Sequence, residues 1–281
     1  MPLIDYENVA TSVSEEDLLR YKSCVLSIMK DFHAFLMAHD IKYSLAFGTL
    51  LGAIRHNGFI PWDDDIDIIL TNEEFHKLLN VIDGFNSDKY LVVRPLDDTY
   101  LAFPACIKIY DKRHSIKEYG STHYNGPFID VFALIGAKSG KRLSLDLRRF
   151  NFYKAALMFK NKRFTKDNFL TTHPGVYSFL SHCVSRKSAK KVVNEYYDRT
   201  VLSDLSVSSY GSPYLYPSEW FSTYSLHKFE SCEFMVTDRY DDFLKLNFGD
   251  YMVLPPEDKR NPHHLENVYF DEEFIEKNGG K

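Results

Sequence analysis

Three aspartates in two short segments have the residue type and spacing of ligands for a divalent cation. Asp65 and Asp67 flank Ile66, so a strand here places both carboxylates on one face and Ile66 in the core. Asp130 is the single charged residue in the apolar run FIDVF at 128–132, where an unpaired carboxylate is costly. Carboxylate oxygens are the ligands that magnesium and manganese prefer. We therefore predict that Asp65, Asp67 and Asp130 bind Mg²⁺ or Mn²⁺.

The same region holds four aspartates within five residues, and so dense a negative charge is unfavourable without a cation. For Asp63 and Asp64 a solvated turn is an equal alternative, and Asp63 is a candidate additional metal ligand. The run lacks the glycine and the later glutamate of an EF-hand loop, which excludes that motif. With a third carboxylate on a neighbouring strand, the set suits two cations about 4 Å apart and in-line attack at phosphorus.

Several residues near these aspartates have the chemistry of a phosphate-binding site. Gly48 and Thr49 end a short apolar run and precede predicted helical turns over 50–55, so their N–H groups and the hydroxyl can bind phosphate. Arg55 can clamp a diphosphate with its guanidinium, with an exposed helix charge as the alternative. Lys108 lies within an apolar strand, where it either extends its ammonium to solvent or meets phosphate.

Histidines and two further residues are weaker candidates for the same site. His56 and the pair His263 and His264 can act as a base toward the acceptor or contact the donor, although isolated histidines are more often structural. Trp62 is expected to pack against the wall of the site, and Glu230 is a further candidate.

These residues need a mixed set of elements to position them. Apolar residues at helical spacing and an acidic first turn predict a helix over 14–39, and a second predicted helix spans 239–248, before Gly249. Short apolar runs predict strands, and Thr71 or Asn72 caps a helix after the first of them. The predicted strands span 66–70, 91–93, 106–110 and 128–132. Strands mixed with helices over 40–135 indicate an α+β (mixed α/β) catalytic core with a mixed β-sheet flanked by helices.

Composition excludes several classes of protein. Of the 281 residues 44% are hydrophobic and 26% charged, which is typical of a globular protein and not of a disordered or low-complexity chain. No apolar run is long enough to span a membrane, and residues 1–7 have no secretory character. The four cysteines form no CxxC pair, so we expect reduced, mostly buried thiols in a cytoplasmic protein.

The net charge of −5 hides two regions of opposite sign. Residues 138–199 carry 15 basic and four acidic side chains, a net charge of +11, and the rest of the chain is at −16. We expect 138–199 to form a basic helical insertion that either docks on an anionic membrane surface or is an ordinary solvated subdomain. A docked protein would lie at the inner face of the plasma membrane.

The order of these motifs resembles the LicD family, which also includes the fukutin-related enzymes. The signature is GTLLGAIRH at 48–56 followed by PWDDDID at 61–67. The segment ACIKIYDK at 105–112 is similar to the family's lysine strand, and FIDVF to its Ile-Asp-Ile-Phe strand. The segment NFGDYMVLPP at 247–256, followed by Arg260 and His263, resembles the family's C-terminal signature. Tyr110 stands where the family has an arginine, so the resemblance implies one phosphate contact fewer here.

The resemblance implies a nucleotidyltransferase fold and a magnesium-dependent phosphotransferase. Such enzymes take phosphocholine or a related phospho-alcohol from a CDP-linked donor and place it on a sugar of the cell surface. Carried onto this sequence, Asp65, Asp67 and Asp130 are the metal ligands, and Gly48 and Thr49 hold the donor diphosphate. The donor-binding set is completed by the basic residues already named, which are Arg55, Lys108, Arg260 and His263. The acceptor is a glycan of lipopolysaccharide, teichoic acid or capsule, or its lipid-linked precursor.

The expected organisation has four parts. Residues 1–40 form a helix on the core, 41–137 the nucleotidyltransferase-like core, 138–200 the basic helical subdomain, and 201–281 complete the core and the site. Three alternatives stay open: another nucleotidyltransferase-fold enzyme, an Asp-x-Asp glycosyltransferase, and an inactive member that binds a phosphorylated sugar or a partner. The glycosyltransferase is disfavoured because only 64 residues precede Asp65, too few for a nucleotide-binding half-sheet. We expect no nucleic-acid partner, because the chain outside 138–199 is acidic.

Overall fold

The computed structural model describes residues 13–97, 105–118, 124–136, 142–160, 183–198, 205–209, 214–260 and 265–269. The described helices are α1 (Glu15–Ala38), α2 (Phe47–His56), α3 (Asn72–Val81), α4 (Arg142–Lys160), α6 (Arg186–Tyr197) and α7 (Tyr240–Phe248), with short 3-10 turns at Ile82–Phe85, Ser218–Phe221 and Glu257–Lys259. The described strands are β1 (Ser44–Leu45), β2 (Asp67–Leu70), β3 (Tyr90–Val93), β4 (Cys106–Asp111), β5 (Ser115–Glu118), β6 (Tyr124–Asn125), β7 (Phe128–Gly136), β8 (Leu205–Ser208), β9 (Tyr216–Pro217), β10 (Tyr224–Phe229), β11 (Cys232–Thr237) and β12 (Leu265–Tyr269).

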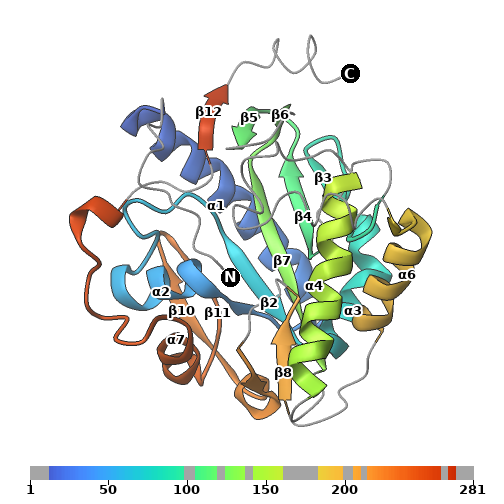
Figure 1. The fold of residues 1–281 in the computed structure, drawn as a ribbon. Helices are drawn as coiled ribbons and strands as arrows, with labels where there is room; N and C mark the ends of the chain where they lie inside the picture. The colour runs from blue at the N-terminus through green and yellow to red at the C-terminus, as the bar shows by residue number, and fades with distance from the viewer. Residues whose placement is uncertain are drawn as a thin grey trace.

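A mixed sheet with the order β1-β2-β7-β4-β3 lies at the centre of the molecule (Figure 1). β2 and β7 are parallel, whereas β1, β3 and β4 pair antiparallel with their neighbours. β8 extends the sheet at the C-terminal end of β7 and pairs in turn with β9. Two small sheets, β10-β11 and β12-β5-β6, lie beside the main one. The predicted α+β class with a mixed, helix-flanked sheet is confirmed.

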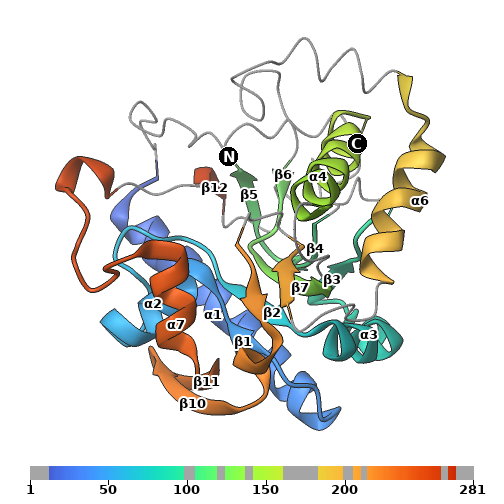
Figure 2. The same ribbon diagram turned by 60° about the horizontal axis from the view of Figure 1, so that its bottom comes forward.

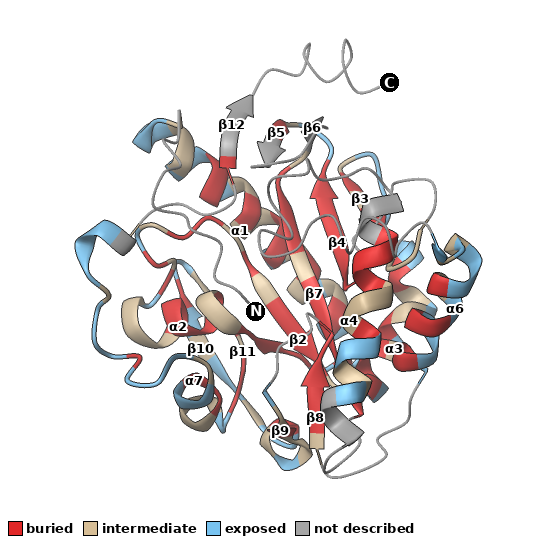
Figure 3. Ribbon diagram, viewed as in Figure 1, coloured by how far each residue is buried: buried red, intermediate tan, exposed pale blue. Residues whose placement is uncertain are grey.

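Helices cover both faces of the central sheet (Figure 2). α1 packs on one face through its contacts with β4 and β7, and α3 lies on the same side, whereas α4 and α6 lie on the other face. β4 and β7 are buried along almost their whole length, which explains why both strands read as nearly continuous apolar runs (Figure 3). Alternate residues of these strands therefore face α1 or the α4–α6 layer.

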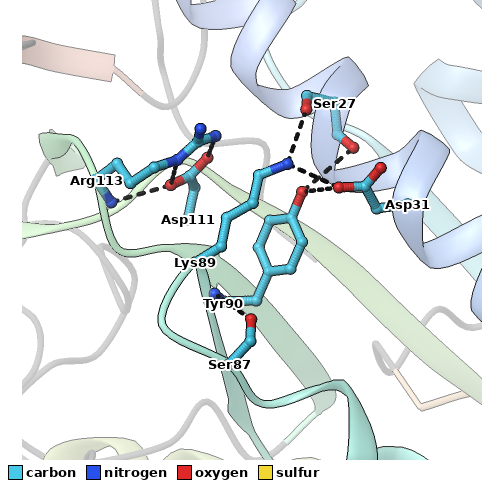
Figure 4. Close-up of polar contacts among 7 residues, drawn as sticks. All are labelled: Ser27, Asp31, Ser87, Lys89, Tyr90, Asp111 and Arg113. Carbon is cyan, nitrogen blue, oxygen red and sulfur yellow. Dashed lines mark hydrogen bonds and ion pairs between the residues drawn. The ribbon is translucent and has the colours of Figure 1, made fainter.

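The helix predicted over 14–39 is confirmed as α1. Ser14 caps it, its hydroxyl oxygen accepting a 3.1 Å hydrogen bond from the Asp17 amide. α1 is tied to β3 by a polar cluster (Figure 4). Both the Lys89 ammonium and the Tyr90 hydroxyl donate to the Asp31 carboxylate, at 2.7 and 2.6 Å.

α2 begins earlier than the sequence predicts. Helical turns are expected over 50–55, with Gly48 and Thr49 in a turn before them, but α2 starts at Phe47 and includes both residues. Phe47 has a left-handed φ of 46°, which redirects the chain out of β1 into the helix. Since Leu50 N–H bonds to the Ala46 carbonyl, Gly48 and Thr49 lie in the first helical turn.

The basic segment is helical where the structure describes it. α4 and α6 pack against each other and join the central hydrophobic core through Phe150, Leu157 and Val193. Residues 161–182 lie outside the described part of the chain. Among the described helices none combines the length and the apolar character needed to cross a membrane.

All four cysteines are free thiols, so the expectation that they form no disulfide is confirmed. The expectation that they are mostly buried is wrong. Cys106 is fully buried in β4, but Cys24 and Cys232 are partly exposed and Cys183 is exposed.

Candidate active site

The parallel pairing of β2 with β7 brings two predicted metal ligands together. Asp67 and Asp130 are direct register partners on these strands, at the point where β2 begins. The Asp130 amide donates to the Ile66 carbonyl at 3.0 Å, so the pairing starts at this level. Ile66 is fully buried while Asp65 and Asp67 are partly exposed, which is the alternation that the sequence predicts. Two carboxylates from distant parts of the chain therefore meet at one sheet position.

Lys108 reaches the same place from β4, where it is the register partner of Asp130. Its ammonium nitrogen lies 2.9 and 3.0 Å from the two carboxylate oxygens of Asp130 and 3.4 Å from the centre of the Phe128 ring. The side chains of Lys108 and Asp130 are only 8% and 13% exposed, so each neutralises the other in a largely dry setting. Lys108 thus does not extend to solvent, and its predicted role in phosphate binding stays a prediction.

The carboxylates of Asp63, Asp64 and Asp65 form a second group, in the loop that connects α2 to β2. One oxygen from each lies within 4.8 Å of the others. We call residues 57–65 the acidic loop. Asp63 lies against the first turn of α2, because a Cβ added to Gly48 would come within 2.6 Å of its Oδ2. Three hard oxygen donors this close fit a divalent cation such as Mg²⁺ or Mn²⁺.

Asp64 has a structural contact besides its place in this group. It is fully buried, and its Oδ2 accepts a 3.2 Å hydrogen bond from the Leu265 amide at the start of β12. A solvated turn at this position, the alternative from the sequence, is therefore wrong for Asp64. Asp63 is 8% exposed and does not fit a solvated turn either.

Thr49 contributes to the site through the backbone of Asp67. Its hydroxyl, 2% exposed, accepts a 2.9 Å hydrogen bond from the Asp67 amide, and the Asp67 carbonyl accepts one from Ala46. The first turn of α2 and the first residue of β2 are thereby fixed to each other. A hydroxyl that accepts one hydrogen bond can still donate another, so this contact is compatible with a phosphate ligand.

A cationic group lies near the other end of α2. The guanidinium of Arg55 donates to the Tyr251 carbonyl at 2.6 Å and to His56 Nε2 at 2.9 Å. Arg260 stacks over the Trp62 ring at 5.4 Å and donates to the Pro255 carbonyl. Burial lowers the pKa of Arg55, and the nearby positive charge of Arg260 lowers it further. Two guanidinium groups close enough to repel each other favour an anion between them.

These contacts determine the protonation state and the tautomer of His56. Burial and the charge of Arg55 both lower the pKa of His56, which favours the neutral imidazole. Nε2 accepts from Arg55, so Nδ1 carries the proton of the neutral ring. His56 therefore orients Arg55, and this geometry does not favour it as the base that activates an acceptor.

Gly48 and Arg55 lie at opposite ends of the site. They are seven positions apart on one helix, which corresponds to about 10 Å along its axis. The carboxylates and Lys108 gather near the first turn of α2, and Arg260 and Trp62 lie near its last turn. The predicted donor contacts thus spread along the helix instead of meeting at one phosphate. His263 and His264 lie outside the described residues.

Three buried side chains next to the site have no motif that marks them. Lys22 of α1 lies under the acidic loop, with its ammonium 2.9 Å from the Pro61 carbonyl. Cys106 is a hydrogen-bonding neighbour of Asp130, and burial, with the Asp130 charge, raises the pKa of its thiol. Burial lowers the pKa of Lys154 in α4 to about 7, so one lysine of the basic segment is a core residue. Isolated lysines and cysteines carry no sequence signal that could have identified them.

Comparison with known proteins places this site in a family. The model described as "LicD/FKTN/FKRP, nucleotidyltransferase domain" matches residues 40–188. The lipopolysaccharide cholinephosphotransferase LicD of Haemophilus influenzae is 30% identical over 252 residues, which cover 87% of this chain and 94% of that protein. An uncharacterized protein of Rickettsia prowazekii is 34% identical over 96 residues, covering 32% of this chain and 36% of that protein.

The fold, the paired carboxylates and these matches define an enzyme of the phosphotransferase class. The chain belongs to the LicD family, whose domain model covers more than half of its residues. The resemblance seen in the motifs at 48–67 and 128–132 is thereby confirmed. Two residues that bond to the acidic loop, Lys22 and Leu265, lie outside residues 40–188 that the family model matches.

Proposed function

We propose that this protein transfers phosphocholine or a related phospho-alcohol from a CDP-linked donor to a hydroxyl group of a cell-surface glycan. The observation that carries the proposal is the alignment with a lipopolysaccharide cholinephosphotransferase over 94% of that protein's length. The register pairing of Asp67 with Asp130 supports it, because it gathers carboxylates where the family motifs expect them. Lipopolysaccharide, teichoic acid and capsule precursors are all candidate acceptors within the proposal.

The proposed cofactor is Mg²⁺ or Mn²⁺. Asp65, Asp67 and Asp130 would hold it, and Asp63 is a candidate additional ligand because its carboxylate lies with that of Asp65 in the acidic loop. When bound, the cation neutralises negative charge on the donor diphosphate. Lys108 already supplies one positive charge beside Asp130, and the cation would supply further positive charge to this group of carboxylates.

The remaining residues bind and orient the donor. The amides of Gly48 and Thr49 lie in the first turn of α2, where a helix favours an anion, and the Thr49 hydroxyl can add a donated hydrogen bond. Lys108 places one positive charge beside the carboxylates. At the far end of α2 the proposed contacts come from Arg55, Arg260 and His263, and the positive charge of Arg260 acts on Arg55.

The proposed reaction is an in-line displacement at the donor phosphorus that carries the alcohol. The acceptor oxygen forms a bond to this phosphorus, the bond to the bridging diphosphate oxygen breaks, and CMP leaves. The acceptor hydroxyl loses its proton to a base, and His56 is not favoured for that step because Arg55 occupies its Nε2. Alignment and charge neutralisation supply most of the catalysis in such a transfer.

The test is a screen of CDP-linked choline, ethanolamine, glycerol and ribitol with Mg²⁺ and a glycan acceptor, read by CMP release. We expect Asp65→Asn and Asp67→Asn, which keep side-chain size and remove charge, to lower the rate about a hundredfold or more. Asp83→Asn, in an exposed ion pair with Arg94, is the matched control and should keep full activity. A wild-type protein that consumes none of the four donors would contradict the proposal.

We also propose that the protein works in the cytoplasm, at the inner face of the plasma membrane. The support is the exposed face of the α4–α6 layer, where Arg148, Lys187 and Lys191 point to solvent. Lysines that lie near an anionic leaflet contribute on the order of 1 kcal/mol each. Such a contact would bring the site close to a lipid-linked acceptor.

A further inference from the structure

Lys22 is an internal cation for which the family motifs give no role. It lies in the first half of α1 and is 8% exposed. Its ammonium donates to the Pro61 carbonyl at 2.9 Å and to the Ile60 carbonyl at 3.3 Å, and it lies 5.4 Å from the centre of the Phe59 ring. All of these contacts are made to the acidic loop, so α1 holds that loop through one side chain.

The charges around Lys22 come from the same loop and from one neighbour. Burial lowers the pKa of Lys22, while the carboxylates of Asp63, Asp64 and Glu230 act against that effect. The ammonium therefore lies within electrostatic reach of two of the three gathered aspartates. A fixed positive charge there offsets part of the repulsion among them.

Glu230 holds the opposite end of the acidic loop. It lies in the turn between β10 and β11, and its backbone amide donates to the Asn57 carbonyl at 2.8 Å. Its Oε1 accepts a 3.0 Å hydrogen bond from the Phe59 amide. A Cβ at Gly58 would overlap this carboxylate, so the Glu230 side chain would have to move away to admit a larger residue there. Glu230 itself has a left-handed φ of 55°, a conformation that the two contacts stabilise.

We propose that Lys22 and Glu230 are positioning residues that keep the acidic loop folded before a divalent cation binds. This rests on the proposed function, in which carboxylates of the loop hold the cation. The two residues come from α1 and from the β10–β11 turn, both outside the residues 40–188 that the family model matches. They act on the loop backbone and on its charge, and neither is a metal ligand.

The proposal has a measurable consequence for the thermodynamics of the loop. With Lys22 in place the carboxylates are already gathered, so an arriving cation adds its own binding energy and orders little of the chain. Without the ammonium the repulsion among the gathered carboxylates is not offset, and an arriving cation then relieves this repulsion in addition to making its own contacts. The stabilisation that a cation gives should therefore be larger in a variant that lacks this charge.

The first experiment measures the increase in Tm that saturating Mg²⁺ or Mn²⁺ causes. We expect Lys22→Met to melt lower than wild type without a cation and to gain at least about 3 °C more than wild type when the cation is added. Lys89→Met is the matched control, because Lys89 also binds α1 through a carboxylate but lies away from the acidic loop. It should lower Tm and leave the cation-induced gain as in wild type.

The outcomes separate this inference from the proposed function. No cation-induced gain in wild type would contradict the metal site itself. A gain in wild type that is equal in Lys22→Met and Lys89→Met would overturn the role of Lys22.

Hydrogen exchange tests the contacts that Glu230 makes with the acidic loop, and it does not depend on whether Lys22→Met folds. Glu230 is exposed, so Glu230→Ala removes only its side-chain contacts. Without a cation, we expect the amides of Phe59 and Asp63 to exchange about tenfold faster in this variant, and the difference to shrink with Mg²⁺. Exchange at wild-type rates would overturn the role of Glu230.

Discussion

The ion pair between Lys108 and Asp130 shows how a single residue contact shapes this site. The two side chains are register partners on adjacent strands and are almost completely buried. A buried ion pair adds little net stability, but removal of one partner leaves an uncompensated charge in a dry environment. The pair is thus expected to be sensitive to substitution on either side.

Lys108→Met tests this sensitivity. We expect it to lower the free energy of unfolding by about 3 kcal/mol, because Asp130 loses its counter-charge in a largely buried setting. The measurement is urea unfolding in the presence of a chelator, so that no divalent cation can replace the ammonium.

A double-mutant cycle supplies the control for that prediction. Lys108→Met combined with Asp130→Asn should cost less than the sum of the single changes, because the second change removes the unpaired charge. Additive costs would show that the ion pair does not account for the loss. Lys112→Met, an exposed lysine in the same segment, should change stability little.

At the residue scale, the sequence predicts which side chains have the chemistry of the site better than it predicts which residues they contact. The isolation of Asp130 in an apolar run and the alternation around Ile66 are enough to predict where the carboxylates lie. The sequence does not reveal that Lys108 pairs with Asp130, since register between strands 22 residues apart depends on the whole sheet. Lys22 is missed for the same reason, because its contacts to Ile60 and Pro61 span 38 and 39 residues.

At the scale of elements, α1 is attached to β3 by the polar cluster of Figure 4. Burial raises the pKa of Asp31, but the hydrogen bonds from Lys89 and Tyr90 outweigh this and lower it. Burial and the bond to Asp31 raise the pKa of Tyr90 to about 12. A carboxylate with a lowered pKa stabilises the folded state above its unfolded pKa, and this contribution is lost as the pH falls through the folded value.

Asp31→Asn should therefore act in a pH-dependent way. At pH 7 we expect a loss of about 1 kcal/mol or less, because the carboxylate is partly exposed to solvent. The difference from wild type should shrink as the pH falls below about 4, where the wild-type carboxylate is protonated as well. Urea unfolding at pH 7 and near pH 3 measures it. Asp40→Asn, just beyond the end of the same helix, is the control, and an equal dependence on pH in both variants would contradict the assignment.

Helices with a strong periodic pattern agree with the prediction, whereas the start of α2 depends on tertiary contacts. α1 and α7 match the predicted ranges closely, since caps and apolar spacing are local features. α2 does not, because its start at Phe47 is set by the left-handed turn and by bonds between Ala46, Thr49 and Asp67. Those bonds join residues about 20 positions apart and leave no local signal.

At the scale of the whole molecule, the basic side chains of residues 138–199 are divided between the surface and the core. The outer face of α4 and α6 carries exposed basic side chains, while Lys154 of α4 is in the core. The acidic part of the chain includes the carboxylates of the candidate site. The net charge of the basic segment therefore overstates the charge that an anionic surface can meet.

Co-sedimentation with vesicles tests the proposed membrane contact. We expect binding to vesicles of anionic lipid at low salt, weaker binding at high salt, and none to neutral vesicles. Lys187→Glu with Lys191→Glu should weaken binding by more than about tenfold. Lys30→Glu with Lys228→Glu changes the net charge equally on other exposed elements and should have a smaller effect. Vesicle binding that does not depend on the salt concentration, or an equal loss of binding in both double variants, would contradict the proposal.

The hydrogen bond from Leu265 to Asp64 joins residues 201 positions apart, and it has a consequence for a chain that is still being synthesised. The acidic loop is made first, and the strand that fixes its buried aspartate follows about 200 residues later. A nascent chain thus carries its gathered carboxylates for many seconds without that final contact, at typical rates of about 5 to 20 residues per second. The acidic loop therefore reaches its final contacts only after the chain has been made as far as Leu265.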